Sequence, residues 1–386
     1  PQGTVIPMLD TRPAEHHILT YQIAQQIIEG TLTDPEGNPC RRGMFMMPPG
    51  SAKSTCLDVV TPSWAMSKSG HEIILASCAD GIAKRHGKRA RALCHSEEHQ
   101  AIFEVDIDPQ TKAADNWALQ NGARYLAAGI HGGLMGNRAD GLIWDDLMKG
   151  RRAAESRTEQ MNTWVAYVDD ARTRKKPGAW ELGIGTRWHK EDPMGKILGE
   201  DWAGESGFIK GLDGYWWYVV CLQAQCEHES DPLGREIGEY LWTEWFHEEG
   251  DPERFWKPLK LDSRSWGSLY MQIPTPPEGT FFKKSWVRYY KDKPKHLNVY
   301  MSADYAVTKA EDADDPDFSC ITIWGMNSEG DLYYLDGWHG KVDAASWTEI
   351  VIDFVEIHKP LVHVAGGGQI RRGVDCLLYT SDAADE

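Results

Sequence analysis

Short apolar runs alternate with longer amphipathic segments through the first half of the chain. Residues 13–29 carry apolar positions at helical spacing and precede an apolar run at 43–47. Further strand-like runs follow at 72–77, 141–144 and 180–185, and segments of helical character separate them. This alternation of strand and helix predicts a parallel α/β sheet.

The second half of the chain has a different pattern. A polar, tryptophan-rich stretch at about 200–275 interrupts the alternation and runs into a proline-rich segment that predicts a linker at 276–295. After the linker, the pattern predicts strands at 298–304, 318–325 and 331–338, a helix at 344–358 and a short strand at 361–365. We therefore expect a first domain at 1–275, with the tryptophan-rich stretch as a subdomain, and a second domain at 296–375.

Composition and charge narrow the class of protein. The 386 residues are 41% hydrophobic and 26% charged, which is ordinary for a globular protein. The sequence contains no run of 18 apolar residues and no signal-peptide pattern, so we expect a soluble cytoplasmic protein without a membrane partner. Its eight cysteines form no C-x-x-C pair, which argues against a zinc site and a disulfide framework.

The formal net charge of -17 argues against a protein coated in basic surface for nucleic acid. A local basic track is still compatible with this charge, and the run at 172–176 (Arg-Thr-Arg-Lys-Lys) is a candidate. The same run could equally be an ordinary solvated face.

The apolar run at 43–47 turns into a segment that resembles a phosphate-binding loop. The usual pattern, G-x-x-x-x-G-K-[ST], would have glycines where this chain has Met47 and Ala52. Backbone N–H groups from Gly50 to Ser54 can still face a triphosphate at a helix start, where the dipole favours an anion. Lys53 would reach the β- and γ-phosphates of ATP, and Ser54 would bind Mg²⁺. The predicted nucleotide-binding residues are Pro49, Gly50, Ser51, Ala52, Lys53, Ser54 and Thr55. The alternative is a strand, a turn and a helix with a solvated lysine.

A second apolar strand, 141–144, ends in the paired carboxylates Asp145 and Asp146. In a nucleoside triphosphatase the first carboxylate holds the Mg²⁺ shell through water, and the second polarises the attacking water. Taken alone, such a pair is often a helix N-cap. The strand at 180–185 leads into Thr186, which we interpret as a sensor of the γ-phosphate or, alternatively, as part of an ordinary polar turn.

These elements, in this order, resemble the large terminase subunit of tailed bacteriophages, the ATP-driven motor and nuclease that packages DNA into procapsids. The resemblance covers about 13–375, and its matching segments are 48–55, 136–140 leading into Asp145 and Asp146, 186–192, 276–282 and 302–305. It implies an α/β fold in which a RecA-like P-loop ATPase domain is followed by a nuclease domain of ribonuclease H type.

The resemblance also implies partners and an arginine that stabilises the charge of the transferred phosphate. Arg138, near the second ATPase element, is the candidate, although it could equally be a structural ion-pair partner. The implied partners are double-stranded DNA, a portal protein, a small terminase subunit and further copies of this chain in a ring on the procapsid. The implied location is the host cytoplasm.

The nuclease half requires several carboxylates that converge on Mg²⁺ or Mn²⁺ ions roughly 3.5–4 Å apart. The resemblance places the first metal ligand at Asp304, which ends the strand at 298–304. Asp317 is a supporting carboxylate or a turn residue. The second essential acid should end the strand at 361–365, where this chain has Ala365 and Gly366. We therefore expect an incomplete nuclease site.

Residues 376–386 resemble the read-through translation of a transposase sequencing adapter, and the alternative is a natural acidic tail. The third nuclease acid is expected beyond this point in the family. We therefore expect a nearly complete motor domain followed by a C-terminally truncated nuclease domain.

The sequence as a whole predicts an ATP-hydrolysing DNA-packaging subunit. Lys53 and Ser54 would bind phosphates and Mg²⁺, while Thr186 would couple hydrolysis to movement. Two alternatives stay open. One is a helicase-like ATPase, and the other is an inactive prophage remnant that only binds DNA or portal.

Overall fold

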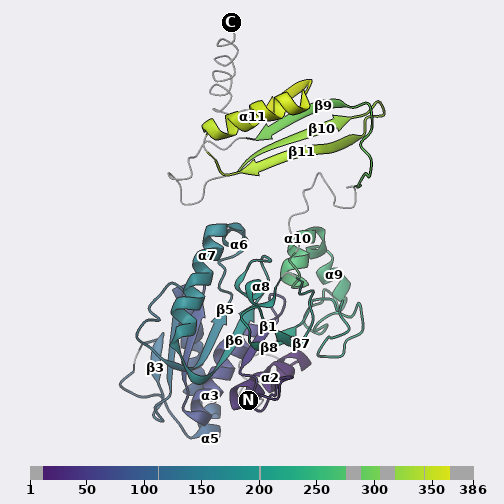
Figure 1. The fold of residues 1–386 in the computed structure, drawn as a ribbon. Helices are drawn as coiled ribbons and strands as arrows, with labels where there is room; N and C mark the ends of the chain where they lie inside the picture. The colour runs from purple at the N-terminus through teal and green to yellow at the C-terminus, as the bar shows by residue number, and fades with distance from the viewer. Residues whose placement is uncertain are drawn as a thin grey trace. The chain divides into compact units, whose positions relative to one another are not determined.

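The computed structural model describes residues 12–111, 113–199, 201–274, 288–304, 318–342 and 344–365. The chain divides into two compact units, Pro1–Lys283 and Lys284–Glu386 (Figure 1).

The first unit is built on one large sheet. Its strands are β1 Arg42–Met46, β2 Glu72–Ser77, β3 Asn116–Ala118, β4 Arg124–Gly129, β5 Ala139–Asp145, β6 Lys175–Gly185, β7 Gly207–Lys210 and β8 Trp216–Cys221. Among the described residues these form an eight-stranded sheet in the order β3-β4-β2-β5-β6-β1-β8-β7. In this sheet order, every neighbouring pair between β4 and β8 is parallel, whereas the edge strands β3 and β7 each pair antiparallel with their neighbour. The predicted parallel α/β fold is confirmed.

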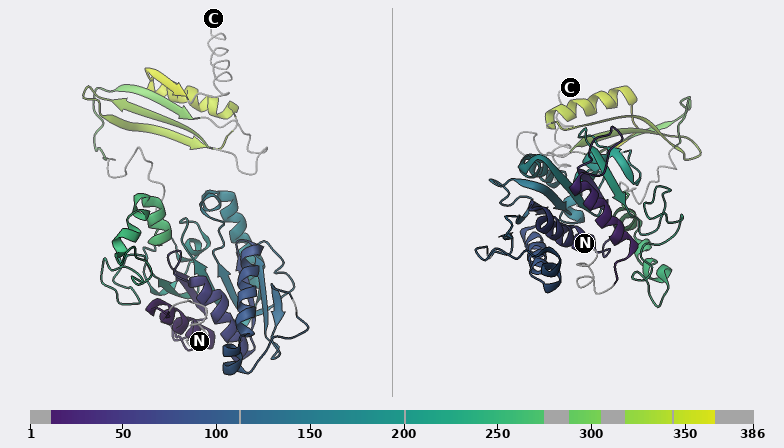
Figure 2. Two further views of the ribbon diagram at one scale, coloured as in Figure 1. Left: turned by 180° about the vertical axis from the view of Figure 1, so that it is seen from behind. Right: turned by 90° about the horizontal axis from the view of Figure 1, so that it is seen from below.

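Helices cover both faces of this sheet (Figure 2). The α-helices are α2 Glu15–Glu29, α3 Thr61–Ser69, α4 Asp80–Cys94, α5 Glu97–Phe103, α6 Arg151–Glu155, α7 Arg157–Val165, α8 Pro193–Leu198, α9 Pro252–Trp256 and α10 Ser263–Ser265. The π-helical segments are η2 Thr55–Val60, η3 Ala166–Ala171 and η6 Trp266–Tyr270, and the 3₁₀ segments are η4 Arg172–Arg174 and η5 Leu259–Leu261.

Each face of the sheet has its own core. One core contains Phe45 and side chains of α2, η2, α3 and α4, and the other contains Met44, Met46 and side chains of η3 and α8. Because successive strand residues point to opposite faces, a strand buried on both sides must be apolar throughout. This requirement explains the unbroken apolar run at 43–47 in the sequence.

The tryptophan-rich stretch is more closely joined to the sheet than its sequence predicts. Within it, β8 pairs in parallel with β1, and β7 pairs with β8 to form the sheet edge. The expectation that the whole stretch interrupts the sheet was therefore wrong for 207–221. Its later part has a small core of its own, formed by Ala224, Phe246, Trp256 and Met271.

Two reciprocal glycine–tryptophan pairs fix the register of β5 against β6. Gly141 lies opposite Trp180, and Trp144 lies opposite Gly183. A Cβ atom would lie 2.0 Å from the Trp180 ring at position 141 and 2.3 Å from the Trp144 ring at position 183. Each glycine therefore leaves the space that a buried indole of the neighbouring strand fills. Because the two pairs belong to the two different cores, a shift of register would lose both.

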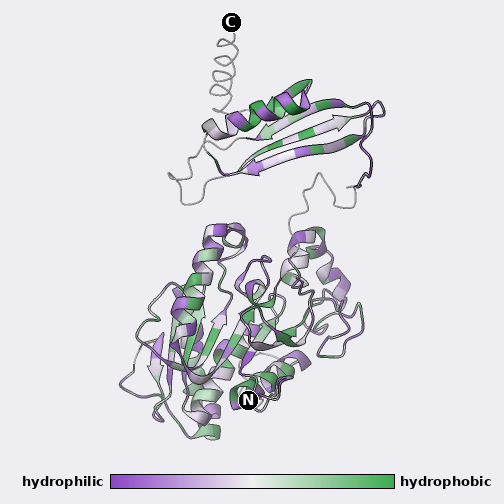
Figure 3. Ribbon diagram, viewed as in Figure 1, coloured by the Kyte–Doolittle hydropathy of each residue, from purple (hydrophilic) through white to green (hydrophobic). Residues whose placement is uncertain are grey.

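The second unit is a smaller sheet with one covering helix. Its elements are β9 Asn298–Asp304, β10 Ser319–Met326, β11 Leu332–Gly340, α11 Ala344–His358 and β12 Val362–Ala365. The strand order among the described residues is β11-β10-β9-β12, in which only the β9–β12 pair is parallel. Hydrophobic and hydrophilic residues alternate along α11 (Figure 3), and its Trp347 and Val351 pack on Met301, Ile321 and Ile323. The strands and the helix predicted here are confirmed to within two residues.

Among the described residues, no helix combines the length and the apolar character needed to cross a membrane.

Gly183→Ala should lower the free energy of unfolding by about 1–3 kcal/mol, because the new methyl group overpacks the space that Trp144 occupies. Urea unfolding followed by circular dichroism measures this change. Gly133→Ala is the matched control, since a Cβ atom there meets nothing within 4 Å. Equal unfolding midpoints for the two variants would contradict the role of the Gly183–Trp144 pair.

Candidate nucleotide-binding site

The predicted ATPase residues follow the ends of three neighbouring parallel strands. In the sheet β6 lies between β1 and β5, with Met46 opposite Gly185 and Asp145 opposite Ile184. The loop after β1, the carboxylates at the end of β5 and Thr186 after β6 therefore meet at one edge of the sheet. In open parallel sheets, ligands bind outside the carboxyl ends of the strands.

The loop after β1 contains two residues in the left-handed backbone region. Gly50 has φ 87° and Ala52 has φ 60°. The left-handed conformation suits glycine at position 50, where a Cβ atom would also lie 3.3 Å from Phe246. Ala52 takes a left-handed conformation although it has a Cβ atom, at a cost of about 1–2 kcal/mol.

The start of the following helix presents Lys53 and Ser54 to this edge. The Lys53 side chain is nearly buried, and its Nζ lies 3.9 Å from Asp146 Oδ2. The Ser54 hydroxyl donates to Asp145 Oδ2 at 3.0 Å. Thr55 is directed elsewhere, because its Oγ1 accepts a hydrogen bond from Arg89 of α4 at 3.1 Å. The structure therefore brings the predicted lysine and serine to the predicted carboxylates.

Asp146 is held on two sides. Its Oδ1 accepts the backbone N–H of Thr186 at 2.8 Å and the Thr186 hydroxyl at 3.3 Å, while Oδ2 faces Lys53. Its backbone has φ 40°, which is uncommon for a residue other than glycine and is typical of functional sites. Thr186 is therefore a direct partner of Asp146 and not an isolated turn residue.

Asp145 lies deeper than Asp146 and is only 3% exposed. Burial raises the pKa of its carboxyl well above the usual range, and the neighbouring Asp58 and Asp146 raise it further. Its Oδ1 makes no hydrogen bond to any described residue. A positive charge at this edge would therefore stabilise the carboxylate form of Asp145.

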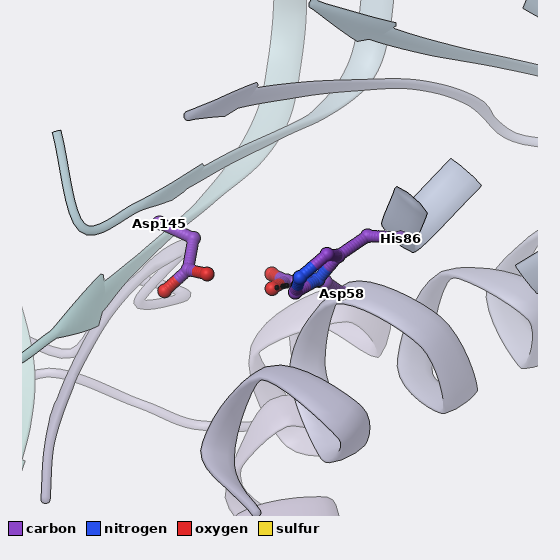
Figure 4. A group of neighbouring side chains, drawn as sticks. All are labelled: Asp58, His86 and Asp145. Carbon is purple, nitrogen blue, oxygen red and sulfur yellow. Dashed lines mark ion pairs between the residues drawn. The ribbon is translucent and has the colours of Figure 1, made fainter. Parts of the chain in front are cut away.

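Sequence reasoning missed two residues behind Asp145. Asp58 of η2 is fully buried, and its Oδ2 lies 2.8 Å from Nδ1 of His86 on α4. The carboxylates of Asp58 and Asp145 point toward each other, with the His86 ring beside Asp58 (Figure 4). The four-residue spacing of Ser54 and Asp58 on one helix was a usable signal for Asp58. No sequence pattern placed His86.

Two histidines of α2 support the loop and were also missed. The ring Nε2 atoms of His16 and His17 each lie 3.2 Å from the Ser51 carbonyl. Because a carbonyl only accepts, both rings carry their proton on Nε2. Burial lowers the pKa of His16 to about 3 and that of His17 to about 4, so both are neutral at pH 7. Trp242 lies against both rings.

A cavity of about 390 Å³ lies beside these histidines. It is lined by residues of the chain before α2, of the α2 start and of the segment 233–244, which are Arg12, Pro13, Ala14, Glu15, His16, Leu233, Arg235, Glu239, Tyr240, Leu241, Trp242, Thr243 and Glu244. Because His16 both lines the cavity and contacts Ser51, the cavity adjoins the loop.

The structure does not place Arg138 with the nucleotide-site residues. Arg138 precedes β5, whereas Asp145 ends the strand, so the strand's length of roughly 20 Å separates them. Its guanidinium donates to the Thr173 carbonyl instead. Arg138 therefore does not lie at the nucleotide-site residues of its own chain, because residues at opposite ends of a strand cannot share a small ligand.

The basic run at 172–176 also has a structural role. Lys175 donates to the buried carboxylate of Glu181 at 2.5 Å, and Arg172 lies 3.8 Å from the same carboxylate. Burial alone would raise the pKa of Glu181, but these two cations outweigh it and lower the pKa. Lys176 pairs with Glu72 and Asp140. These three cations neutralise acids of this chain, so they are not available to bind DNA phosphates.

In the second unit, Asp304 ends β9 and is exposed. Asp317 and Gly366 lie outside the described residues. Ala365 pairs with Ala303 and packs toward the core beneath α11, the face opposite to that of Asp304. Asp336 accepts from His358 of α11 at 2.8 Å, so it also lies on the α11 side. The described acids of this unit therefore do not converge on Asp304.

Comparisons with known proteins found matches only among solved structures. No protein-family model matches the chain, and no curated protein matches it. The large terminase from a thermophilic bacteriophage matches with a TM-score of 0.39 and 12% identity, over 93% of this chain and 80% of that chain. A second crystal form of the same terminase matches with a TM-score of 0.39 and 11% identity, over 96% of this chain and 80% of that chain.

The same phage terminase in complex with ADP matches with a TM-score of 0.37 and 12% identity, over 93% of this chain and 80% of that chain. At such identity these structures assign no role to individual side chains. The roles of Lys53, Ser54, Asp145 and Asp146 therefore depend on their own geometry.

Asp58→Asn should remove a pH dependence of stability that the metal-free protein has. Burial raises the pKa of Asp58 to about 7, whereas an unfolded aspartate titrates near its ordinary value of 3.8. Between these values the folded state binds the extra proton, so the contribution of Asp58 to stability is greatest below about pH 4 and falls toward pH 7. The slope should approach about 1.4 kcal/mol per pH unit.

Urea unfolding of both proteins in EDTA, from about pH 4.5 to about pH 7.5, measures the difference. The variant loses the Asp58 carboxyl and also the effect of that carboxyl on the pKa of Asp145, so it should gain stability relative to the parent as pH rises. Parallel pH profiles would contradict the raised pKa of Asp58.

Proposed function

We propose that this chain is an ATP-hydrolysing motor subunit of the large terminase type, which uses ATP to move double-stranded DNA. The observation that carries the ATPase part is the arrangement at the strand ends, where Ser54 bonds to Asp145 and Asp146 lies between Lys53 and Thr186.

The loop is proposed to bind the phosphates of ATP. Backbone N–H groups from Gly50 to Ser54 lie at a helix start, where the helix dipole favours anions. Lys53 contributes a positive charge in a nearly buried position, where electrostatic interactions are strong. The ammonium that faces Asp146 would then also face the β- and γ-phosphates.

The residues beside the loop fit a magnesium ion that accompanies the nucleotide. Ser54 Oγ and Asp145 Oδ2 lie 3.0 Å apart and offer a hydroxyl and a carboxylate oxygen. Hard oxygen ligands of this kind suit Mg²⁺. The ion would supply charge stabilisation to the phosphates and would favour the ionised form of Asp145.

Asp146 is proposed to orient and polarise the attacking water. Two hydrogen bonds from Thr186 fix one of its carboxylate oxygens, so the side chain has a defined direction. A base that acts on a reacting water must be held in such a way. The cavity beside His16, Tyr240 and Trp242 is the proposed site of the adenine base, because it adjoins the loop and contains aromatic rings.

A hydrogen-bonded route leads away from Thr186 and supports a motor. The backbone N–H of the next residue, Arg187, donates to the side-chain oxygen of Gln272 at 3.2 Å. Gln272 is fully buried with φ 61°, close to the end of the first unit's described chain. A change at Thr186 on hydrolysis would therefore be passed to Gln272 through this bond.

DNA packaging itself is proposed from the order of the sequence motifs and from the second unit with Asp304. Double-stranded DNA, a portal protein, a small terminase subunit and other copies of this chain in a ring are the proposed partners. Mg²⁺ or Mn²⁺ would be the metal of a complete nuclease unit of this type. A helicase-like ATPase and an inactive remnant that binds only DNA or portal are the competing functions.

Lys53→Ala should reduce ATP turnover at least about a hundredfold, because the lysine stabilises phosphate charge in a nearly buried site. Turnover by the parent chain should rise when double-stranded DNA is added. Steady-state phosphate release with and without DNA measures both effects. Circular dichroism of the variant should match that of the parent.

Lys84→Ala is the matched control for this experiment, because Lys84 is an exposed lysine of α4 that pairs with Asp115. Its turnover should equal that of the parent. Parent-like turnover by Lys53→Ala would refute the nucleotide site. ATP turnover without any response to DNA would refute the motor, and no turnover at all would favour the binding remnant.

The chain should show no metal-dependent DNA cleavage. Asp304 lies on the sheet face opposite to that of Ala365 and Asp336, so the acids that the structure describes around it are too few to hold two divalent ions against their hydration. The test incubates supercoiled plasmid with the chain in Mg²⁺ or Mn²⁺, beside Asp304→Ala. Cleavage by the parent that the variant lacks would contradict this prediction.

A further inference from the structure

Three buried side chains from three different elements meet behind the nucleotide site. Asp58 comes from η2, His86 from α4 and Asp145 from the end of β5. One ligand atom from each lies within 4.8 Å of the other two. Figure 4 shows the two carboxylates directed toward each other across a short gap, with the imidazole beside Asp58.

The hydrogen bonds of the protein do not satisfy this cluster. Asp58 is 0% exposed, and neither of its carboxylate oxygens makes an aligned hydrogen bond to a described residue. The contact with His86 Nδ1 at 2.8 Å lacks hydrogen-bond geometry. Two ionised carboxylates only accept hydrogen bonds, so Asp58 and Asp145 cannot satisfy each other unless a proton or a cation lies between them.

Lys53 acts on both carboxylates, but its ammonium pairs with a third acid. Lys53 lies at an ion-pair distance from Asp146 and is the cation that lowers the pKa values of Asp58 and Asp145. Burial lowers the pKa of His86, so its imidazole is predominantly neutral at pH 7. A neutral imidazole brings no charge but offers a nitrogen lone pair, which is the form that binds metals.

We propose that Asp58, His86 and Asp145 form a binding site for one divalent transition-metal ion of the zinc or cobalt class. Two carboxylates and one imidazole are ligands that such ions accept in tetrahedral sites with a fourth position for water. The nitrogen ligand and the depth of the site disfavour Mg²⁺, which prefers oxygen ligands and retains several waters.

This site is distinct from the proposed magnesium position, although both use Asp145. Ser54 donates to Asp145 Oδ2, whereas Asp145 Oδ1 has no hydrogen-bond partner among the described residues. One carboxylate can therefore serve Ser54 on the nucleotide side and the ion on the side of Asp58. Metal binding is measurable on nucleotide-free protein, so its test does not depend on the proposed ATPase activity.

The experiment titrates the EDTA-treated and dialysed 386-residue chain with Co²⁺ and records its visible absorption. Zn²⁺ titration calorimetry is the second measurement. The parent should bind one equivalent of either ion. Its cobalt spectrum should lack thiolate charge-transfer bands, which separates this site from binding at cysteines. Asp58→Asn and His86→Gln should each weaken binding at least about tenfold, since loss of outer-shell partners alone costs roughly 10–100-fold.

His95→Gln is the matched control, because His95 forms an exposed pair with Asp106 at the end of the same helix α4. It should bind like the parent. If the parent binds no metal ion tightly, the proposal is wrong, and Asp58 and Asp145 share a proton instead. The proposal is also wrong if a variant with the parent's circular dichroism binds the metal with the parent's affinity. A cobalt spectrum with thiolate bands in the parent would likewise contradict the proposal, because it would show binding at cysteines.

Discussion

The position of β6 between β1 and β5 is the constraint on which the rest of the site depends. Parallel pairing places the carboxyl ends of these strands at one edge, so the loop, the carboxylates and Thr186 become neighbours. The Gly141–Trp180 and Gly183–Trp144 pairs fix this pairing from both faces of the sheet. A one-residue slip would exchange the two faces of a strand and separate Asp146 from Thr186.

Two groups of buried acids in the first unit differ in whether neighbouring groups compensate their negative charge. Glu181 is fully buried, but Lys175, Arg172 and the Tyr167 hydroxyl all contact it, so its charge is compensated. Asp58 and Asp145 are buried as deeply without a comparable set of partners. Burying uncompensated carboxylates costs stability, and proteins concentrate such costs at functional sites. The first group is structural, whereas the second joins Asp145 of the proposed nucleotide site to Asp58 behind it.

Much of the architecture was predictable from local pattern. The apolar runs at 72–77 and 298–304 became strands with those bounds, because strand periodicity is a property of neighbouring residues. The later stretch at 207–221 was misjudged, because only its pairing with β1 gives it a place in the sheet. Arg138 was misplaced for a related reason. Proximity along the chain to Asp145 conceals the length of the strand between them.

The sequence by itself determined the loop with Lys53 and Ser54, the paired carboxylates at a strand end and the division into two units, since these depend on spacing along the chain. The tertiary structure alone decided the strand order and the hydrogen bonds from Thr186 to Asp146. It also decided the contacts of His16 and His17 with the loop, and the contact of Asp58 with His86. Contacts of this second kind join residues that are far apart in sequence. They arise from packing across the sheet edge, which leaves no periodic signal in the chain.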